Sequence, residues 1–312
     1  MLSRHNIRIK VLQTLYAYYQ SESTNTAIAE KNYFKSVNES YRLFLLNILY
    51  LQEVADYSQK DFEIKSNKYV PTEEDKKASL RLYENEPLTA IRENDYFQSM
   101  IKKNKLHQHI DKDLVRKLYK AFAKTSYYKN YLEEKELSIK EQQYCLVFLY
   151  KNMLSDEHFL EHLEDVSPIS EDDQSLIFGA IKRTIRTLPE EEDFCQAQLP
   201  NDEFVDEFGR ELLYKTIRHN EDFQALIVEK LKNWEEDRVA ILDMMILKMG
   251  ICEFMYFETI PTKVTINEYV SLAKDYSTDK SKRFINGVLD RVMKELQEKG
   301  EIQKEGRGLK DN

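Results

Sequence analysis

The chain has 312 residues, with 46 Lys and Arg against 55 Asp and Glu, so its formal net charge is −9. This acidic balance excludes a general polyanion-binding protein, and any contact with nucleic acid must come from a local basic patch. Only 7 Gly and 6 Pro occur, while 32% of the residues are charged, which is typical of helices with few tight turns.

The first helix is predicted over residues 4–20, where Ile7, Val11 and Leu15 recur at helical spacing and form one buried stripe. The polar stretch SESTNT then breaks the pattern. A long helix is predicted over residues 31–65, and the polar segment SNKYVPTEEDKK follows it as a loop. Further helices are predicted over 81–103, 111–132, 138–154, a short segment ending at 164, and 171–187.

An acidic linker is predicted next, because residues 189–207 carry eight acidic side chains and no basic one, and we expect it to be solvated. The last third then predicts helices over residues 202–218, 221–234, 237–256, 264–276 and 281–298. We expect residues 300–312 to form a disordered tail. No alternation of period two survives anywhere, so the sequence predicts an all-α fold without strands.

The three cysteines, Cys145, Cys195 and Cys252, are far apart and form no CxxC pair. This spacing favours reduced thiols over a disulfide framework or a zinc knuckle. No stretch approaches 18 consecutive apolar residues, and the polar start MLSRHNIRIK does not read as a signal peptide. We therefore expect a soluble, cytoplasmic protein that makes no membrane contact.

The segment HFLEH has the spacing of an inverted zinc-protease motif, with His158, Glu161 and His162 as its polar positions. Helical geometry places Phe159 and Leu163 on the apolar side and the three polar residues on the solvent side. A catalytic metal needs a dry cleft and a third ligand, so we predict no metal site here. Glycine-rich phosphate-binding loops and nucleophile motifs are also missing from the sequence, and we expect neither a cofactor nor catalytic residues.

A basic run lies between residues 102 and 129, where nine Lys and Arg face only two carboxylates. An ordinary solvated helix face with Leu114, Leu118 and Phe122 buried explains it, and so does a contact with RNA. The basic residues are Lys102, Lys103, Lys105, Lys112, Arg116, Lys117, Lys120, Lys124 and Lys129.

Two arginines stand at the start of the first helix. Arg8 falls near the centre of the buried stripe, with Arg4 one turn before it, whereas Lys10 falls on the opposite, solvent-facing side. We interpret the two arginines as the place where the stripe leaves the core and meets a ligand. A rim ion pair with a nearby carboxylate is the alternative.

A second group of cations stands at the start of the last helix, for which we predict a beginning near Ser281, with Ser277 as an alternative cap. The group consists of Lys280, Lys282 and Arg283, followed by Phe284. Each exposed cation near a helix N-terminus opposes the helix dipole by about 0.3–1 kcal/mol. A bound phosphate would reverse this sign, and Phe284 could stack on a base, so the pattern favours single-stranded RNA or a structural ion-pair cluster.

The end of the chain contains the run IPTKVTINEYVSLAK followed by KRFINGVLD, and the first helix reads RHNIRIKVLQTLYAYYQS. These segments resemble the NusB family of transcription antitermination factors. The resemblance covers residues 1–21 and 201–299. Residues 22–200 have no counterpart in the short family members, and we expect them to form a helical insertion that ends in the acidic linker.

The resemblance implies an all-α fold of two small bundles without catalysis. Family members bind boxA, a single-stranded RNA element of ribosomal RNA leader transcripts, together with the ribosomal protein NusE. The complex then allows the elongating RNA polymerase to read through terminators. By resemblance, RNA contacts fall on Arg4, Arg8 and the stretch from Lys280 to Phe284, and NusE contacts fall on Tyr16 and Asp243.

His5 and Asn6 depart from the family, which often has further arginines at these positions, so the basic patch is weaker here. Two alternatives stay open. The insertion could make the chain a helical scaffold that acts through protein contacts alone. The chain could also be an RNA-binding domain related to the appendages of rRNA methyltransferases, although it lacks the glycine-rich cofactor loop that such enzymes need.

Overall fold

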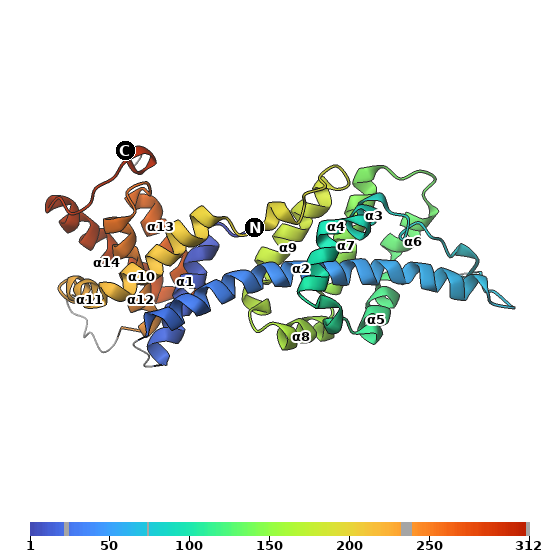
Figure 1. Cartoon of the computed structure of the whole chain (residues 1–312), viewed down its shortest axis with the longest axis horizontal. Coiled ribbons are helices and arrows are strands. Elements are labelled where there is room, and N and C mark those ends of the chain that lie inside the picture. Colours follow the sequence, from blue (N-terminus) through green and yellow to red (C-terminus); the bar gives the residue numbers. More distant parts are fainter. Residues whose placement is uncertain (22–24, 74, 232–238, 310–312) are drawn as a thin grey trace. The chain divides into compact units, whose positions relative to one another are not determined.

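A computed structural model describes the whole chain except residues 22–24, 74, 232–238 and 310–312. All regular elements in the described ranges are helices (Figure 1), which confirms the predicted all-α fold. The chain divides into two compact units. Unit 1 consists of Met1 and Asn38–Leu199, and unit 2 consists of Leu2–Val37 and Pro200–Asn312.

Unit 1 is built around α2 (Thr26–Ser66), whose residues from Asn38 onward belong to it. Its other α-helices are α3 (Glu86–Glu93), α4 (Asp95–Lys103), α5 (Lys112–Ala123), α6 (Ser126–Glu133), α7 (Ile139–Met153), α8 (Glu157–Val166) and α9 (Ser170–Thr187). Short 3-10 turns occur at η1 (Asp75–Lys77), η2 (Leu106–His109) and η3 (Gln196–Gln198).

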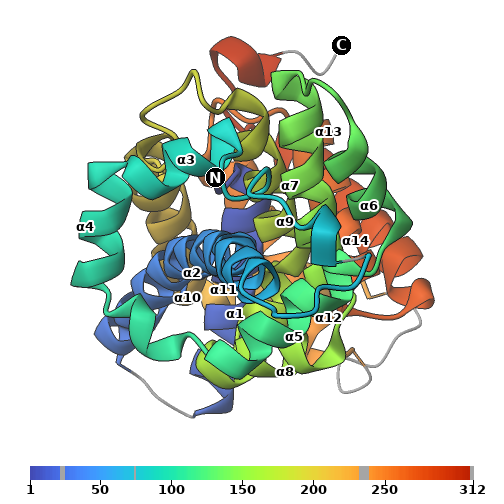
Figure 2. The ribbon, with the colours of Figure 1, turned by 90° about the vertical axis from the view of Figure 1, so that its right-hand side faces the viewer.

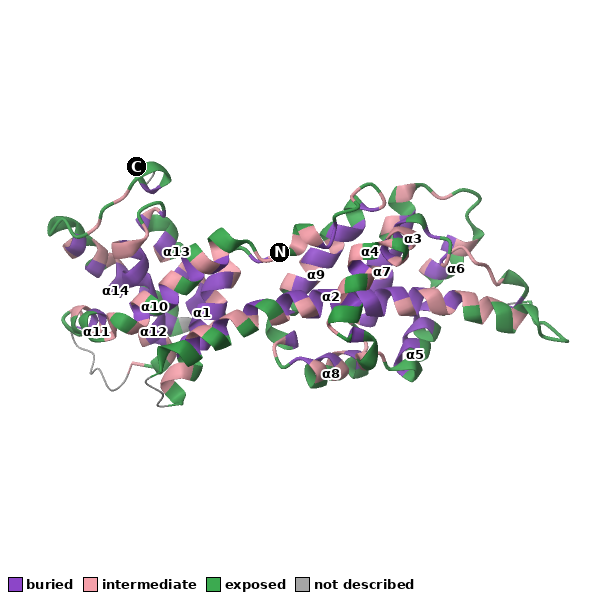
Figure 3. Cartoon of the chain, viewed as in Figure 1, coloured by how far each residue is buried: buried purple, intermediate pink, exposed green. Residues whose placement is uncertain are grey.

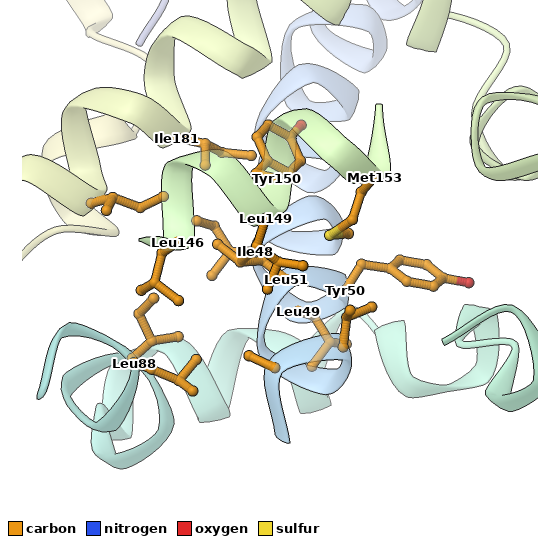
Figure 4. Packing of buried hydrophobic residues seen from close by; sticks show 14 of the residues in the cluster. Ile48, Leu49, Tyr50, Leu51, Leu88, Leu146, Leu149, Tyr150, Met153 and Ile181 are labelled. Atoms are coloured by element: carbon orange, nitrogen blue, oxygen red, sulfur yellow. The ribbon is translucent and has the colours of Figure 1, made fainter. Parts of the chain in front are cut away.

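The core of unit 1 surrounds the middle of α2. Nearly every side chain between Tyr41 and Ala55 is buried, which is typical of a helix covered on all sides. The view along α2 shows the other helices of the unit around it (Figure 2). Leucines and a tyrosine of α3 and α7, together with isoleucines of α9, pack onto it (Figure 4). Its last turns are largely exposed (Figure 3).

Hydrogen bonds between buried polar groups tie the helices of this core together. Tyr150 OH donates to Asn47 Oδ1 at 2.9 Å, and Asn47 in turn donates to the carbonyl oxygen of Leu43 at 2.8 Å. The hydroxyl of Ser40 donates to the buried Asp173 carboxylate. Since an unpaired buried polar group costs free energy, these bonds fix how α7 and α9 meet α2.

Unit 2 contains α1 (Arg4–Gln20), the first turns of α2, a π-helical stretch η4 (Glu203–Arg210), and η6 (Gly306–Leu309). Its remaining helices are α10 (Glu211–Arg218), α11 (Asn220–Val228), α12 (Ile241–Tyr256), α13 (Thr262–Tyr276) and α14 (Asp279–Glu298). α12 is central, because it contacts α1, α10, α11, α13 and α14. Every residue of α12 from Met245 to Phe254 is buried as a result.

α1 is also covered on several sides, by η4, α10 and α12. This packing buries Ile7, Val11 and Leu15 as the stripe predicts. The predicted solvent-facing position of Lys10 is wrong, because the side chain is only 1% exposed. The prediction assumes that only one face of α1 is covered, but helices pack against more than one face.

The joint between η4, α1 and α2 depends on a glycine. Tyr33 of α2 is fully buried, and its hydroxyl donates to the carbonyl oxygen of Val205 at 2.9 Å. A Cβ at Gly209 would lie 2.0 Å from the Tyr33 hydroxyl oxygen and 2.4 Å from Cγ2 of Ile7. Only glycine lets the three helices approach this closely.

Several predicted boundaries differ from the structure for local reasons. The helix predicted over 81–103 is two helices, because Asn94 ends α3 and its side chain caps α4. The helix predicted over 111–132 is likewise divided at Thr125, which caps α6. The ends of two predicted helices, at residues 232–234 and 237–238, lie outside the described residues.

The predicted solvated linker is anchored at its centre. Phe194 and Cys195 are buried in unit 1, and Tyr41 OH donates to the Cys195 carbonyl oxygen at 3.1 Å. The high negative charge of the stretch predicts solvation throughout, but these two apolar residues pack into the core of unit 1. The helices then resume at η4, where Val205 and Phe208 are buried in unit 2.

Candidate nucleic-acid interface

The last helix begins earlier than predicted. Thr278 is its N-cap, and the Thr278 side chain accepts a hydrogen bond from the backbone N–H of Ser281, so α14 starts at Asp279. The three predicted cations therefore lie within its first two turns. Lys280, Lys282 and Arg283 are exposed, and none of them forms an ion pair with the described part of the chain. Phe284 is half-buried, so less of its ring is open to a ligand than predicted.

A buried carboxylate organises this helix start. Asp243, in the first turn of α12, is 5% exposed, and Ser277 Oγ donates to its Oδ1 at 2.6 Å. Ser281 Oγ lies 2.9 Å from the Ser277 hydroxyl and 2.9 Å from that of Thr278. This network connects α12 to the cap of α14. Asp243 therefore offers little surface to NusE, contrary to the contact that the resemblance implies.

Arg8 does not face solvent either. It is 2% exposed, and its Nε and Nη2 donate to the two carboxylate oxygens of Glu253, each at 2.8 Å. Thr265 and Tyr269 donate to the same carboxylate, and Arg8 Nη1 donates to Glu268 Oε2 at 3.2 Å. Burial opposes the charge of Arg8, but the Glu253 carboxylate more than offsets this and raises the pKa of Arg8. The predicted RNA contact at Arg8 is replaced by a buried ion pair.

Arg4 lies at the rim of the same helix. Its side chain is 36% exposed and its Nη2 is 3.0 Å from Glu203 Oε1. The guanidinium also lies over the rings of Phe204 and Phe208, at 5.3 and 5.7 Å from their centroids. The rim ion pair that the sequence offers as an alternative is present, and the guanidinium keeps some accessible surface.

Arg4 borders a shallow depression of about 610 Å³ between the starts of α1 and α13. Its basic lining comes from Arg4, His5, Lys263 and Arg307, besides the buried Arg8. Glu268 is the one carboxylate among its lining residues, and His5 Nδ1 lies 2.9 Å from Glu268 Oε2. The depression is therefore a second basic surface, of which the sequence predicts only Arg4 and Arg8.

Arg307 reaches this surface because the tail is docked, whereas the sequence predicts disorder over residues 300–312. Lys304 Nζ donates to the carbonyl oxygen of Phe257 at 2.8 Å, which satisfies an end of α12. The backbone N–H of Glu305 donates to Glu258 O at 3.0 Å. A Cβ at Gly308 would lie 2.0 Å from that same oxygen, so glycine permits the approach. Residues 310–312 lie outside the described residues.

The two basic surfaces do not merge. Ser277 contacts α12 at Asp243, and Arg8 contacts it at Glu253, which is ten residues further along. At about 1.5 Å per residue, roughly 15 Å of helix axis separates these anchoring points. Only an extended ligand could contact both surfaces.

Tyr16 is the remaining predicted partner residue. It lies on α1 and is 40% exposed, so its ring is accessible to a protein partner.

The histidines of the HFLEH segment differ from each other. His158 has a 72% exposed side chain, as predicted. His162 is turned inward, with its Nε2 2.6 Å from Tyr50 OH and 2.8 Å from the carbonyl oxygen of His109. Its predicted solvent position is therefore wrong, because a hydrogen-bonded place beside a core tyrosine is available. Across the described ranges, no group of three or more His, Cys, Asp or Glu side chains is arranged to hold a metal ion.

Comparison with known proteins relates this chain to a family. The NusB family profile matches residues 172–294. The transcription antitermination protein NusB of Finegoldia magna is 45% identical over 103 residues, which are 33% of this chain and 74% of that protein. The chain belongs to the NusB family. The resemblance seen in the sequence is thereby confirmed.

Two further NusB proteins extend the comparison. The one from Salinibacter ruber is 36% identical over 111 residues, covering 36% of this chain and 69% of the relative. The one from Chloroherpeton thalassium is 38% identical over 117 residues, covering 36% of this chain but only 56% of the relative. The chain thus spans little more than half of that NusB protein. No solved structure matches the chain.

The NusB match begins in α9 and ends in α14. It includes the capped start of α14 but excludes α1, most of unit 1 and the docked tail. None of the helices in the described ranges is long and apolar enough to cross a membrane.

Proposed function

We propose that this NusB-family chain is a non-enzymatic transcription antitermination factor. It binds boxA-type single-stranded RNA of ribosomal RNA leader transcripts together with NusE, and it promotes read-through by the RNA polymerase elongation complex. The three relatives compared above all carry the name transcription antitermination protein. Because the chain spans only part of one of them, the activity and the partners are proposals.

The start of α14 is the observation that carries the RNA contact. Lys280, Lys282 and Arg283 are exposed in its first two turns and make no ion pair with the described residues. Each costs about 0.3–1 kcal/mol against the helix dipole when no anion is present. The Asp243 network nevertheless fixes this helix start, so the cations are held ready for phosphate.

An RNA strand that runs from the start of α14 towards the depression at Arg4 would gain further contacts with basic side chains. Lys263 and Arg307 lie there beside Arg4. Because the acidic remainder of the chain repels a polyanion, binding should depend strongly on these local groups and on salt.

Lys282→Glu tests the RNA contact, with Lys294→Glu as a matched control. Both lysines lie on α14, and Lys294 is an exposed residue paired with Asp290. Affinity for a boxA-type RNA oligonucleotide is measured by fluorescence anisotropy at several salt concentrations. We expect Lys282→Glu to weaken binding several-fold and to lower the salt slope by about 0.7, the value for one phosphate contact on a single strand.

We expect the control to leave both quantities unchanged. Equal affinity and slope in the two variants would contradict the assignment of the α14 start. Absence of RNA binding by the unmodified chain, with and without NusE, would contradict the proposed function itself.

Tyr16 tests the partner. It is exposed on α1, whereas Asp243 is buried, so we assign only Tyr16 to the NusE contact. Tyr16→Ala should weaken NusE association in a pull-down without altering RNA binding by the chain alone. Asp243→Ala should instead weaken RNA binding and leave NusE association unchanged, because it loosens the cap of α14. An unchanged NusE complex in Tyr16→Ala would remove this assignment.

A further inference from the structure

Unit 1 contains a cavity of about 630 Å³ that has no part in the proposed RNA contact. It lies between the last turns of α2, the segment around η1, and helices α5 and α6. Cavities that bind small molecules typically measure about 300–1,000 Å³, so this one is of suitable size. It also contains the end of the basic run that stands out in the sequence.

The lining of the cavity is rich in lysine. The lysines are Lys65, Lys77, Lys120, Lys124 and Lys129. They face three carboxylates, those of Asp61, Glu73 and Glu133. The lining therefore carries two more positive than negative groups, although the chain as a whole is acidic.

Each of these carboxylates already has a lysine partner. Lys65 Nζ lies 2.6 Å from Asp61 Oδ2, and Lys77 Nζ lies 2.7 Å from Glu133 Oε1. Glu73 is paired with Lys76, which lies outside the cavity lining. Lys120 and Lys124 make no ion pair with the described residues. The positive surplus is thus concentrated at the end of α5.

Apolar and aromatic side chains complete the lining. Phe62, Ala123 and Leu132 contribute apolar surface, and Tyr119 and Tyr128 contribute aromatic rings. Tyr119 is 3% exposed, and its hydroxyl donates to Asp61 Oδ2 at 3.2 Å, which fixes that wall. A lysine in the last turn of a helix is stabilised by the helix dipole, which explains the placement of Lys120. The dipole does not explain the apolar surface beside it.

We propose that this cavity binds a small organic anion with a planar apolar body, such as an aromatic sulfonate, carboxylate or phosphate ester. Lys120 and Lys124 bind the anionic group, and the body packs between Phe62 and the tyrosine wall. The positive surplus disfavours a metal ion. The recessed shape suits a compact molecule better than a polynucleotide.

The test uses anilinonaphthalene sulfonate, a fluorescent aromatic anion, and phenylnaphthylamine, its uncharged analogue. Both are titrated into the full chain and into Lys120→Gln/Lys124→Gln. The matched control is Lys102→Gln/Lys103→Gln, which removes two exposed lysines of the same basic run outside the cavity. Circular dichroism verifies that the helices of each variant are intact.

We expect the cavity variant to bind the anionic probe at least about tenfold more weakly, since two charge-assisted contacts are lost. The control should bind it as the unmodified chain does, and neither variant should change binding of the neutral probe. Phe62→Ala should weaken both probes. Equal binding of the anionic probe by the cavity variant and the control would overturn the proposal, whether both bind as the unmodified chain does or both are equally weakened.

Discussion

Arg4 and Arg8 show how one helical turn changes the role of a residue. The sequence predicts an RNA contact for both, yet Arg8 is enclosed with Glu253 while Arg4 stays at the rim beside Glu203. A buried charge is tolerated only with a well-placed partner, and here two carboxylate oxygens match the guanidinium fork. Arg8 therefore stabilises the joint between α1 and α12.

Arg8→Ala should lower the free energy of unfolding by about 3–5 kcal/mol, because it leaves the Glu253 carboxylate buried without its cation. Arg4→Ala should cost less than about 1 kcal/mol, because the lost ion pair is exposed. Urea denaturation followed by circular dichroism measures both. A similar small cost for the two variants would show that the Arg8 pair contributes little to stability.

The position of Arg8 on the buried stripe was predictable, but the partners of Arg8 and Asp243 were not. Helical spacing places Arg8 on the buried stripe of α1, yet Glu253 lies 245 residues away in sequence, and only the folded chain brings the two together. Asp243 is a similar case, because its hydrogen-bond partner Ser277 lies in the connection between α13 and α14, 34 residues away in sequence. The three cations of α14 were predictable as exposed because their helix has one clear apolar stripe.

At the scale of the elements, tight helix contacts depend on single atoms. Gly209 stands where η4 crosses α1 and α2, and a methyl group there would overlap Tyr33 and Ile7. A methyl group added at Gly287, within α14, would have no neighbouring atom within 4 Å. These two glycines therefore allow opposite predictions for the same substitution.

Gly209→Ala should destabilise unit 2 by about 1–3 kcal/mol, the usual cost of overpacking. Gly287→Ala should instead stabilise it by about 0.5–1 kcal/mol, because alanine loses less backbone entropy in a helix. Thermal or urea unfolding gives both values. A loss of stability in both variants would mean that the space around Gly287 is needed.

Most helices were predictable from periodicity, and the breaks between them were less so. Asn94 and Thr125 are good N-cap residues, but apolar spacing continues across each of them and conceals the break. The docking of the tail had no periodic signal, because it depends on hydrogen bonds to the backbone at Phe257 and Glu258.

At the scale of the whole molecule, each unit has its own core and its own cysteine reporters. Cys145 and Cys195 are buried in unit 1, and Cys252 is buried in unit 2. Burial raises the pKa of Cys252 to about 12 and raises the pKa of the other two thiols as well. Since the thiolate is the reactive form, all three should resist modification in the folded chain.

Gly209→Ala should speed the reaction of Cys252 with a thiol reagent at low urea and leave that of Cys145 unchanged. The substitution lies in unit 2, so the core of unit 1 should keep its protection. Mass spectrometry of peptides after timed labelling separates the two sites. Equal acceleration at both cysteines would show that the units unfold as one.

The docked tail affects how this chain should be handled at the bench. Ser3 and Arg307, near opposite ends of the sequence, border the same depression. A purification handle attached close to Ser3 or Arg307 would lie next to that surface, and a polyhistidine handle could mimic or mask its charge. Titrations with polyanions are therefore best performed after the handle has been cleaved off, or with it placed on an exposed loop of unit 1.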